Sequence, residues 1–96
     1  GNRFRHAALV GKYQAQGIRP LLEEIAQFLV GLGLEVSLER ATAQATGITS
    51  YGALSARELG ERCDIAVVVG GDGTMLGFAR EIAPFDTPLV GINQGR

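Results

Sequence analysis

VVGGDGTML, residues 68–76, places one acidic side chain, Asp72, inside a glycine-rich turn. The apolar and mostly β-branched run Ile65–Val69 leads into the turn and predicts a parallel strand that is covered on both faces. After the turn, apolar residues recur with helical spacing from Thr74 to Ile82. A glycine turn between a strand and a helix presents backbone N–H groups, which favour an anionic ligand over an anionic side chain. A carboxylate in this position therefore points to a specific task for Asp72.

Strands and helices alternate along the rest of the chain. The predicted strands are Ala7–Val10, Leu34–Glu39, Ile65–Val69 and Leu89–Ile92, and the predicted helices are Leu21–Leu32, Ser55–Arg62 and Thr74–Ile82. Helices that connect consecutive parallel strands make right-handed crossovers. The sequence therefore predicts an α/β fold with a Rossmann-like parallel sheet.

The starts of two helices carry recognisable signals. Pro20 is expected at the first position of the first helix, with Glu23 and Glu24 in its first turn. Ser55 and Glu58 have the spacing of a capping box, in which the serine caps the backbone and the glutamate reaches back. We therefore expect these two helices to begin at or next to these residues.

Other segments carry weaker signals. The strict alternation of Leu34–Glu39 predicts a strand with one solvent-exposed face, near a sheet edge. Residues 41–52 are rich in Ala, Thr and Gln and are expected to form a loop. His6 is expected on the surface before the first strand, Lys12 as a solvated side chain that lies close enough to reach a phosphate, and Cys63 as a buried thiol.

Length and charge exclude several classes of function. A chain of 96 residues suits one domain with a modest core. Its formal charge of −1, without a basic stripe, argues against nucleic acid as a partner. The sequence has no apolar run long enough to cross a bilayer and shows no secretory signal, so we expect no membrane partner and a cytoplasmic location.

In open parallel sheets, ligands bind outside the carboxyl ends of the strands. Two segments fall there, Gly70–Gly73 and Asn93–Gly95, and they are expected to line one crevice. The glycines match neither the dinucleotide fingerprint nor the P-loop, so Gly70 and Gly71 either form a tight turn or contact phosphate. Valine in place of Gly71 is expected to impair binding, by blocking the approach of phosphate or by excluding a positive φ.

Asp72 has three possible tasks. It can cap the helix, hold a magnesium ion that bridges phosphate oxygens, or accept a proton from a hydroxyl that attacks phosphorus. The second and third tasks both belong to phosphoryl transfer, in which the protein mainly positions groups and stabilises charge.

The residues of the turn also resemble a known family. GGDGT, residues 70–74, is similar to the motif shared by NAD kinases, lipid kinases of the diacylglycerol and sphingosine type and, in a variant, phosphofructokinases. The later stretch PLVGINQGR, residues 88–96, resembles the segment that follows this motif in NAD kinases, and the proline-glycine-threonine signature of lipid kinases is missing. The resemblance to bacterial NAD kinases spans the chain, with its specific motifs in the last third.

This resemblance implies transfer of the γ-phosphoryl group of ATP, or of polyphosphate, to the ribose 2′-hydroxyl of NAD, with a divalent cation such as Mg²⁺ as cofactor. It implies that Asp72 accepts the proton of that hydroxyl and that Gly73 contacts NAD through its backbone. Gly70, Gly71 and Thr74 are implied to shape the phosphate turn, and Asn93 to help form the crevice wall. The resemblance assigns no residue of the chain as a metal ligand.

The family pattern continues beyond the motifs found here, with a C-terminal β-rich domain. We therefore expect residues 1–96 to be the N-terminal α/β domain of a larger two-domain kinase, inactive alone, that forms a homo-oligomer through the missing domain. Two alternatives stay open: a lipid kinase or phosphofructokinase-like kinase with the same turn, and a non-catalytic module that senses nucleotides.

Overall fold

The computed structural model describes residues 4–11 and 17–93. Five strands form one sheet in the order β3-β2-β1-β4-β5, and every neighbouring pair is parallel. The strands are β1 (His6–Gly11), β2 (Glu35–Glu39), β3 (Gly52–Leu54), β4 (Ile65–Gly70) and β5 (Leu89–Asn93). The helices are α1 (Ile18–Gly31), α2 (Arg40–Thr46), α3 (Ala56–Arg62) and α4 (Asp72–Ile82), followed by a 3₁₀ turn, η1 (Ala83–Phe85). The predicted α/β fold with a Rossmann-like parallel sheet is confirmed.

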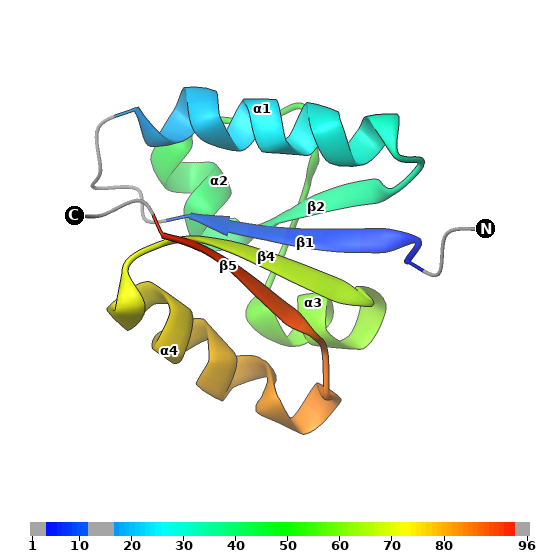
Figure 1. The fold of residues 1–96 in the computed structure, drawn as a ribbon, viewed down its shortest axis with the longest axis vertical. Helices are drawn as coiled ribbons and strands as arrows, with labels where there is room; N and C mark the ends of the chain where they lie inside the picture. Colours follow the sequence, from blue (N-terminus) through cyan, green and yellow to red (C-terminus); the bar gives the residue numbers. More distant parts are fainter. Residues whose placement is uncertain (1–3, 12–16, 94–96) are drawn as a thin grey trace.

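Helices cover both faces of the sheet (Figure 1). On one face, α1 packs through Leu22, Ala26 and Leu29 onto a core that α2 joins through Ala43. On the other face, α3 and α4 close a second core, with Leu59 from α3 and Phe78 and Ile82 from α4. Because alternate residues of β1 and β4 point into different cores, these interior strands are apolar throughout, as parallel strands buried on both faces require.

Of the two predicted helix starts, the one at Ser55 is confirmed. The capping box is present: the Ser55 hydroxyl accepts a hydrogen bond from the Glu58 backbone N–H, and the Ser55 N–H donates to the Glu58 carboxylate. Hydrogen bonding of the Glu58 carboxylate to Ser55, first to its backbone N–H and then to its side chain, lowers the pKa of Glu58. The predicted start of α1 is wrong, because Gly17, with φ of 78°, caps the helix and buried Ile18 opens it. Pro20 is therefore its third residue, where its missing N–H still costs nothing.

The strand predicted at Leu34–Glu39 is present as β2 and lies next to the edge strand, but its predicted solvent-exposed face is wrong, because Ser37 is only 4% exposed. Strand β3 pairs with β2 on its outer side, and the Ser37 hydroxyl lies 2.7 Å from Nε2 of His6. His6 is the first residue of β1 and half-buried, so its predicted place on the surface before the strand is also wrong. A buried serine is stable here because its hydroxyl has a partner.

The predicted loop at residues 41–52 is wrong as well, since it contains most of α2 and the start of β3. The buried hydroxyl of Thr42 holds α2 in place: it accepts a hydrogen bond from the Gly11 N–H at 3.1 Å and lies 2.8 Å from a Glu39 carboxylate oxygen. These contacts join α2 to the end of β1, which lies far away in sequence.

Cys63 is buried, as predicted, and burial raises the pKa of its thiol to about 12. The thiol is therefore protonated and inert at neutral pH. Within residues 4–11 and 17–93, none of the helices combines the length and the hydropathy needed to span a bilayer.

Candidate active site

The carboxyl ends of β1, β4 and β5 meet at one edge of the sheet. Gly11 of β1 pairs with Val69 of β4, and Gly70 of β4 pairs with Asn93 of β5. The chain leaves β1 toward β2 on one side and leaves β4 toward β5 on the other, so the strand order reverses between β1 and β4. Crevices at such reversal points are the usual ligand sites of open parallel sheets. The glycine turn lies at this edge, on the left in Figure 1.

The turn itself is built from two glycines in different conformations. Gly70 has φ of 148°, which strongly favours glycine, and ends β4. Gly71 has φ of −90° and ψ of −174°, an extended conformation open to any residue, and caps α4. Gly71 therefore does not have a positive φ. Of the two reasons for expecting Gly71→Val to impair binding, the conformational one is wrong. The glycine requirement lies one residue earlier.

Helix α4 begins at Asp72, two residues before the predicted start. Its first N–H groups have no intrahelical acceptor, and Gly71 has no side chain with which to cap them. These groups therefore remain available to an anion, and the partial positive charge at the start of the helix adds to their attraction.

Asp72 is exposed, and its carboxylate has no hydrogen-bond or ion-pair partner among the residues that the structure describes. It is not the helix cap, since the cap position belongs to Gly71. Its charge in the first turn of α4 favours the helix by about 0.3–1 kcal/mol through the helix dipole. The carboxylate is free to contact a ligand.

Two pockets flank the first turn of α4. The β4–β5 pocket, of about 170 Å³, is lined by Val68, Gly70, Gly71, Asp72, Met75, Gly91 and Ile92. The β1–α4 pocket, of about 250 Å³, lies on the other side of the helix and includes Gly11, Glu39, Thr42, Gly73, Thr74 and Glu81. The turn therefore divides between two spaces: Gly70, Gly71 and Asp72 face one, and Gly73 and Thr74 face the other.

Close packing shapes the β4–β5 pocket. A Cβ added to Gly91 would overlap the end of the Met75 side chain, so α4 approaches β5 at a residue without a side chain. This contact fixes the distance between the turn and β5. Sequence reasoning found the turn but not the role of Gly91 or of Thr42, because no local pattern marks a contact between distant segments.

The charge around both pockets is negative. Asp72 lines the first pocket, Glu39 and Glu81 line the second, and no described lysine or arginine lines either. The part of the chain that the structure describes also has no group of three or more His, Cys, Asp or Glu placed to hold a metal ion. A phosphorylated ligand would thus depend on backbone N–H groups of this domain and on cations from elsewhere.

The remaining site candidates are only partly described. Asn93 ends β5 beside Gly70, so its backbone borders the crevice, while its side chain lies outside the described residues, as do Lys12 and residues 94–96. Of the segments expected to line one crevice, Gly70, Gly71 and Asp72 line the β4–β5 pocket with Gly91 and Ile92, whereas Gly73 lines the β1–α4 pocket.

Comparison with known proteins gives a consistent result. The family model for the ATP-NAD kinase N-terminal domain matches residues 8–96. An NAD kinase of Methylibium petroleiphilum is 63% identical over 95 residues, covering 99% of this chain and 32% of that protein. An NAD kinase of Polaromonas naphthalenivorans is 60% identical, with 99% and 33% covered. This chain thus spans about a third of the length of these relatives.

The fold also matches a solved structure, that of yeast NADH kinase complexed with NADH. The TM-score is 0.80, and the match covers 99% of this chain and 33% of that one. At 17% sequence identity, this likeness concerns the fold alone.

Proposed function

The chain belongs to the NAD kinase family, and from this premise we propose that the full-length protein transfers the γ-phosphoryl group of ATP, or of polyphosphate, to the ribose 2′-hydroxyl of NAD, producing NADP. The relatives are named NAD kinase, which does not favour a lipid kinase, a phosphofructokinase-like kinase or a sensing module.

The observation that carries the proposal is the position of Asp72. Its exposed carboxylate has no partner in the described chain, lines a pocket where the strand order reverses, and begins a helix whose first N–H groups are uncapped. A carboxylate beside anion-binding N–H groups can take the proton of a hydroxyl while the N–H groups stabilise phosphoryl charge. We assign Asp72 as the proton acceptor for the 2′-hydroxyl.

The neighbouring residues take supporting roles in this proposal. Gly73 contacts NAD through its backbone, and Gly70, Gly71 and Thr74 shape the phosphate turn. Asn93 contributes to the crevice wall from the end of β5. The positive φ of Gly70 and the open space around Gly71 support these roles, because both let a ligand approach the backbone closely.

A Mg²⁺ ion fits this site only together with a nucleotide. Proteins commonly bind Mg²⁺ through one or two carboxylates plus substrate phosphates, and Asp72 provides one exposed carboxylate beside the turn. When bound, the ion would neutralise phosphate charge. Such neutralisation would offset the repulsion between ATP and the carboxylates that line the two pockets.

The rest of the full-length protein would supply what this domain lacks. We propose that residues 1–96 form the N-terminal domain and that a second domain provides the other wall of the NAD site and the contacts of a homo-oligomer. The length of the relatives supports a second domain, since each is about three times as long as the region matched. A cytoplasmic location follows from the proposed substrates, because ATP and NAD are metabolites of that compartment.

Asp72→Asn in the full-length protein tests the proposal. Asparagine keeps the size of the side chain but cannot accept the proton, so kcat for NADP formation should fall by about 10²–10⁴-fold, or about 2.7–5.4 kcal/mol of barrier. The measurement is steady-state NADP formation at saturating ATP, Mg²⁺ and NAD. Thermal unfolding of the variant should show a change in stability of no more than about 0.3–1 kcal/mol, which is what the Asp72 charge contributes through the helix dipole.

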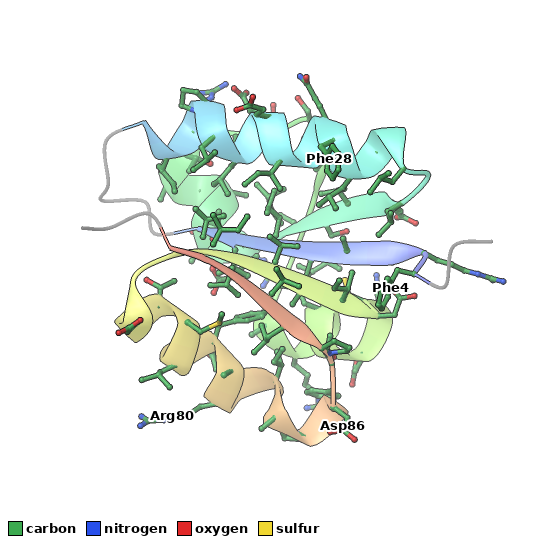
Figure 2. All side chains as sticks on the ribbon, viewed as in Figure 1. Phe4, Phe28, Arg80 and Asp86 are labelled. Atoms are coloured by element: carbon green, nitrogen blue, oxygen red, sulfur yellow. The ribbon has the colours of Figure 1, made fainter. Side chains whose placement is uncertain are left out.

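Asp86→Asn is the matched control, because Asp86 is exposed and precedes β5, at the end of the strand opposite to the turn (Figure 2). The Asp86→Asn variant should form NADP with the kcat of the wild type. Turnover of Asp72→Asn within a few-fold of wild type would end the assignment. A Mg²⁺ titration of Asp72→Asn separates metal binding from proton acceptance. Loss of a metal ligand would raise the Mg²⁺ concentration needed for half-maximal activity, whereas loss of a proton acceptor alone would not.

A further inference from the structure

On the face of the sheet that carries α1, the outer strand β5 is left partly exposed, although strands of parallel sheets are usually covered by helices on both faces. On the face that carries α1, the helix lies over β1 and β2 and contacts both strands. Next to it, Val67 and Val69 of β4 are still buried on this face, whereas Val90 of β5 is 45% exposed. The opposite face of these two strands is closed by α4, whose Met75 packs against Gly91. The two faces of the β4–β5 pair are therefore unequal.

A groove runs along this uncovered region, and we call it the α1–β5 groove. It has a volume of about 540 Å³ and is lined on one side by Leu21, Ile25 and Phe28 of α1 and on the other by Val67, Val90 and Ile92. Phe28 is 64% exposed and Val90 45% exposed. Figure 2 marks Phe28 on α1.

The sequence of β5 fits a strand that is covered on both faces. Leu89 points into the core beneath α4, whereas Val90 and Ile92 point into the groove. Strands of parallel sheets read as continuous apolar runs because helices cover both faces. Val90 therefore has the residue type of a buried position in an exposed location, and contiguous exposed apolar side chains mark an interaction surface.

We propose that an amphipathic helix from the additional region found in the relatives, about two-thirds of their length, packs into the α1–β5 groove of the full-length protein. The helix would lie on the sheet beside α1 and complete the missing layer. The groove is large and almost wholly apolar, so a segment of the same chain, present at high local concentration, fits it better than a small polar ligand. This proposal does not depend on the reaction catalysed.

Glu24 predicts one feature of the sequence of the docked helix. It is the only charged residue among the described residues that line the groove, and it lies on α1 beside Ile25. An apolar helix face with a lysine or arginine at its border would place a positive charge near this carboxylate. We therefore expect a basic residue at the edge of the apolar stripe of the docked helix.

Cysteine labelling in the full-length protein tests the proposal. Val90→Cys places a thiol in the groove, and Val30→Cys places one on α1 outside it; the two valines are 45% and 49% exposed. The native Cys63 is buried and serves as a common background. With a docked helix, a small neutral maleimide should modify Val90→Cys at least about tenfold more slowly than Val30→Cys, because labelling then requires local opening.

The measurement is repeated over a hundredfold range of protein concentration. Protection that persists at every concentration supports docking within one chain. Equal labelling rates at the two positions would overturn the proposal, and so would protection that disappears on dilution, since a second copy would then cover the groove.

A second pair of variants covers the case in which cysteine perturbs the strand. Val90→Asp should lower the melting temperature of the full-length protein by several degrees, and Val30→Asp should leave it nearly unchanged, because only the first aspartate would be buried by the helix. Equal melting temperatures for the two aspartate variants would contradict the docked helix.

Discussion

At the scale of single residues, two adjacent glycines of the turn have separate functions. Gly70 needs its positive φ, whereas Gly71 is extended, and a Cβ added to Gly71 would meet no atom within 4 Å. The fold therefore requires glycine at the first position, and only a ligand could require it at the second.

Substitution separates these two requirements. Gly71→Ala in the full-length protein should leave the melting temperature unchanged and weaken NAD or ATP binding by at least about tenfold, or about 1.4 kcal/mol, because the methyl group blocks the approach of phosphate. Gly70→Ala should instead destabilise the protein by about 1–3 kcal/mol through backbone strain. Calorimetric titration and thermal unfolding measure the two effects. Unchanged affinity in Gly71→Ala would remove the phosphate-turn role.

At the scale of one element, α3 depends on its capping box. Ser55→Ala removes the hydroxyl that accepts the Glu58 N–H, so the free energy of unfolding should fall by about 1 kcal/mol. Ser50→Ala is the control, because Ser50 is exposed and has no hydrogen bond in the described chain. Urea unfolding of both variants measures the difference, and equal stabilities would show that the cap contributes nothing.

The packing of α3 on η1 limits the size of the residue at position 60. A Cβ added to Gly60 would overlap the ring of Phe85, so Gly60→Ala should destabilise the protein by about 1–3 kcal/mol despite the better helix propensity of alanine. Gly31→Ala, at the end of α1 with open space around it, should be neutral or slightly stabilising. Thermal unfolding compares the two. A stabilised Gly60→Ala would mean that α3 and η1 do not pack as described.

Elements defined by local signals could be predicted from the sequence, and elements defined by distant contacts could not. The apolar run of β4, the glycine turn and the capping box at Ser55 are visible in a few adjacent residues. Helix α2 is not, because its anchor is the hydrogen bond between Thr42 and Gly11. The burial of Ser37 likewise depends on His6 and on β3.

In the candidate site too, features set by adjacent residues could be predicted and features set by distant contacts could not. Asp72 and its glycines stand out in the sequence because a carboxylate is unusual in such a turn. Met75 lies in the motif region, but its packing on Gly91 requires knowing that α4 crosses β5. The negative surroundings contributed by Glu39 and Glu81 also emerge only in the fold, where residues of β2 and α4 line the same pocket.

At the scale of the whole molecule, the pockets suggest that this domain does not work alone. The described lining of both pockets contains three carboxylates and no basic side chain. The isolated 96-residue chain should therefore bind NAD weakly and form no measurable NADP from ATP and NAD. A coupled assay with the full-length protein as the positive control checks this. Robust NADP formation by the isolated chain would contradict the two-domain proposal.

Because β1 lies in the middle of the sheet, its two edges are paired at different times during synthesis on the ribosome. Strand β1 pairs with β2 soon after it emerges, but its other edge must wait for β4, about 55 residues later. At about 5–20 residues per second, that edge stays open for about 3–11 s. An apolar strand with an unpaired edge readily recruits other strands, so the nascent chain passes through an interval of vulnerability to aggregation that the finished sheet no longer shows.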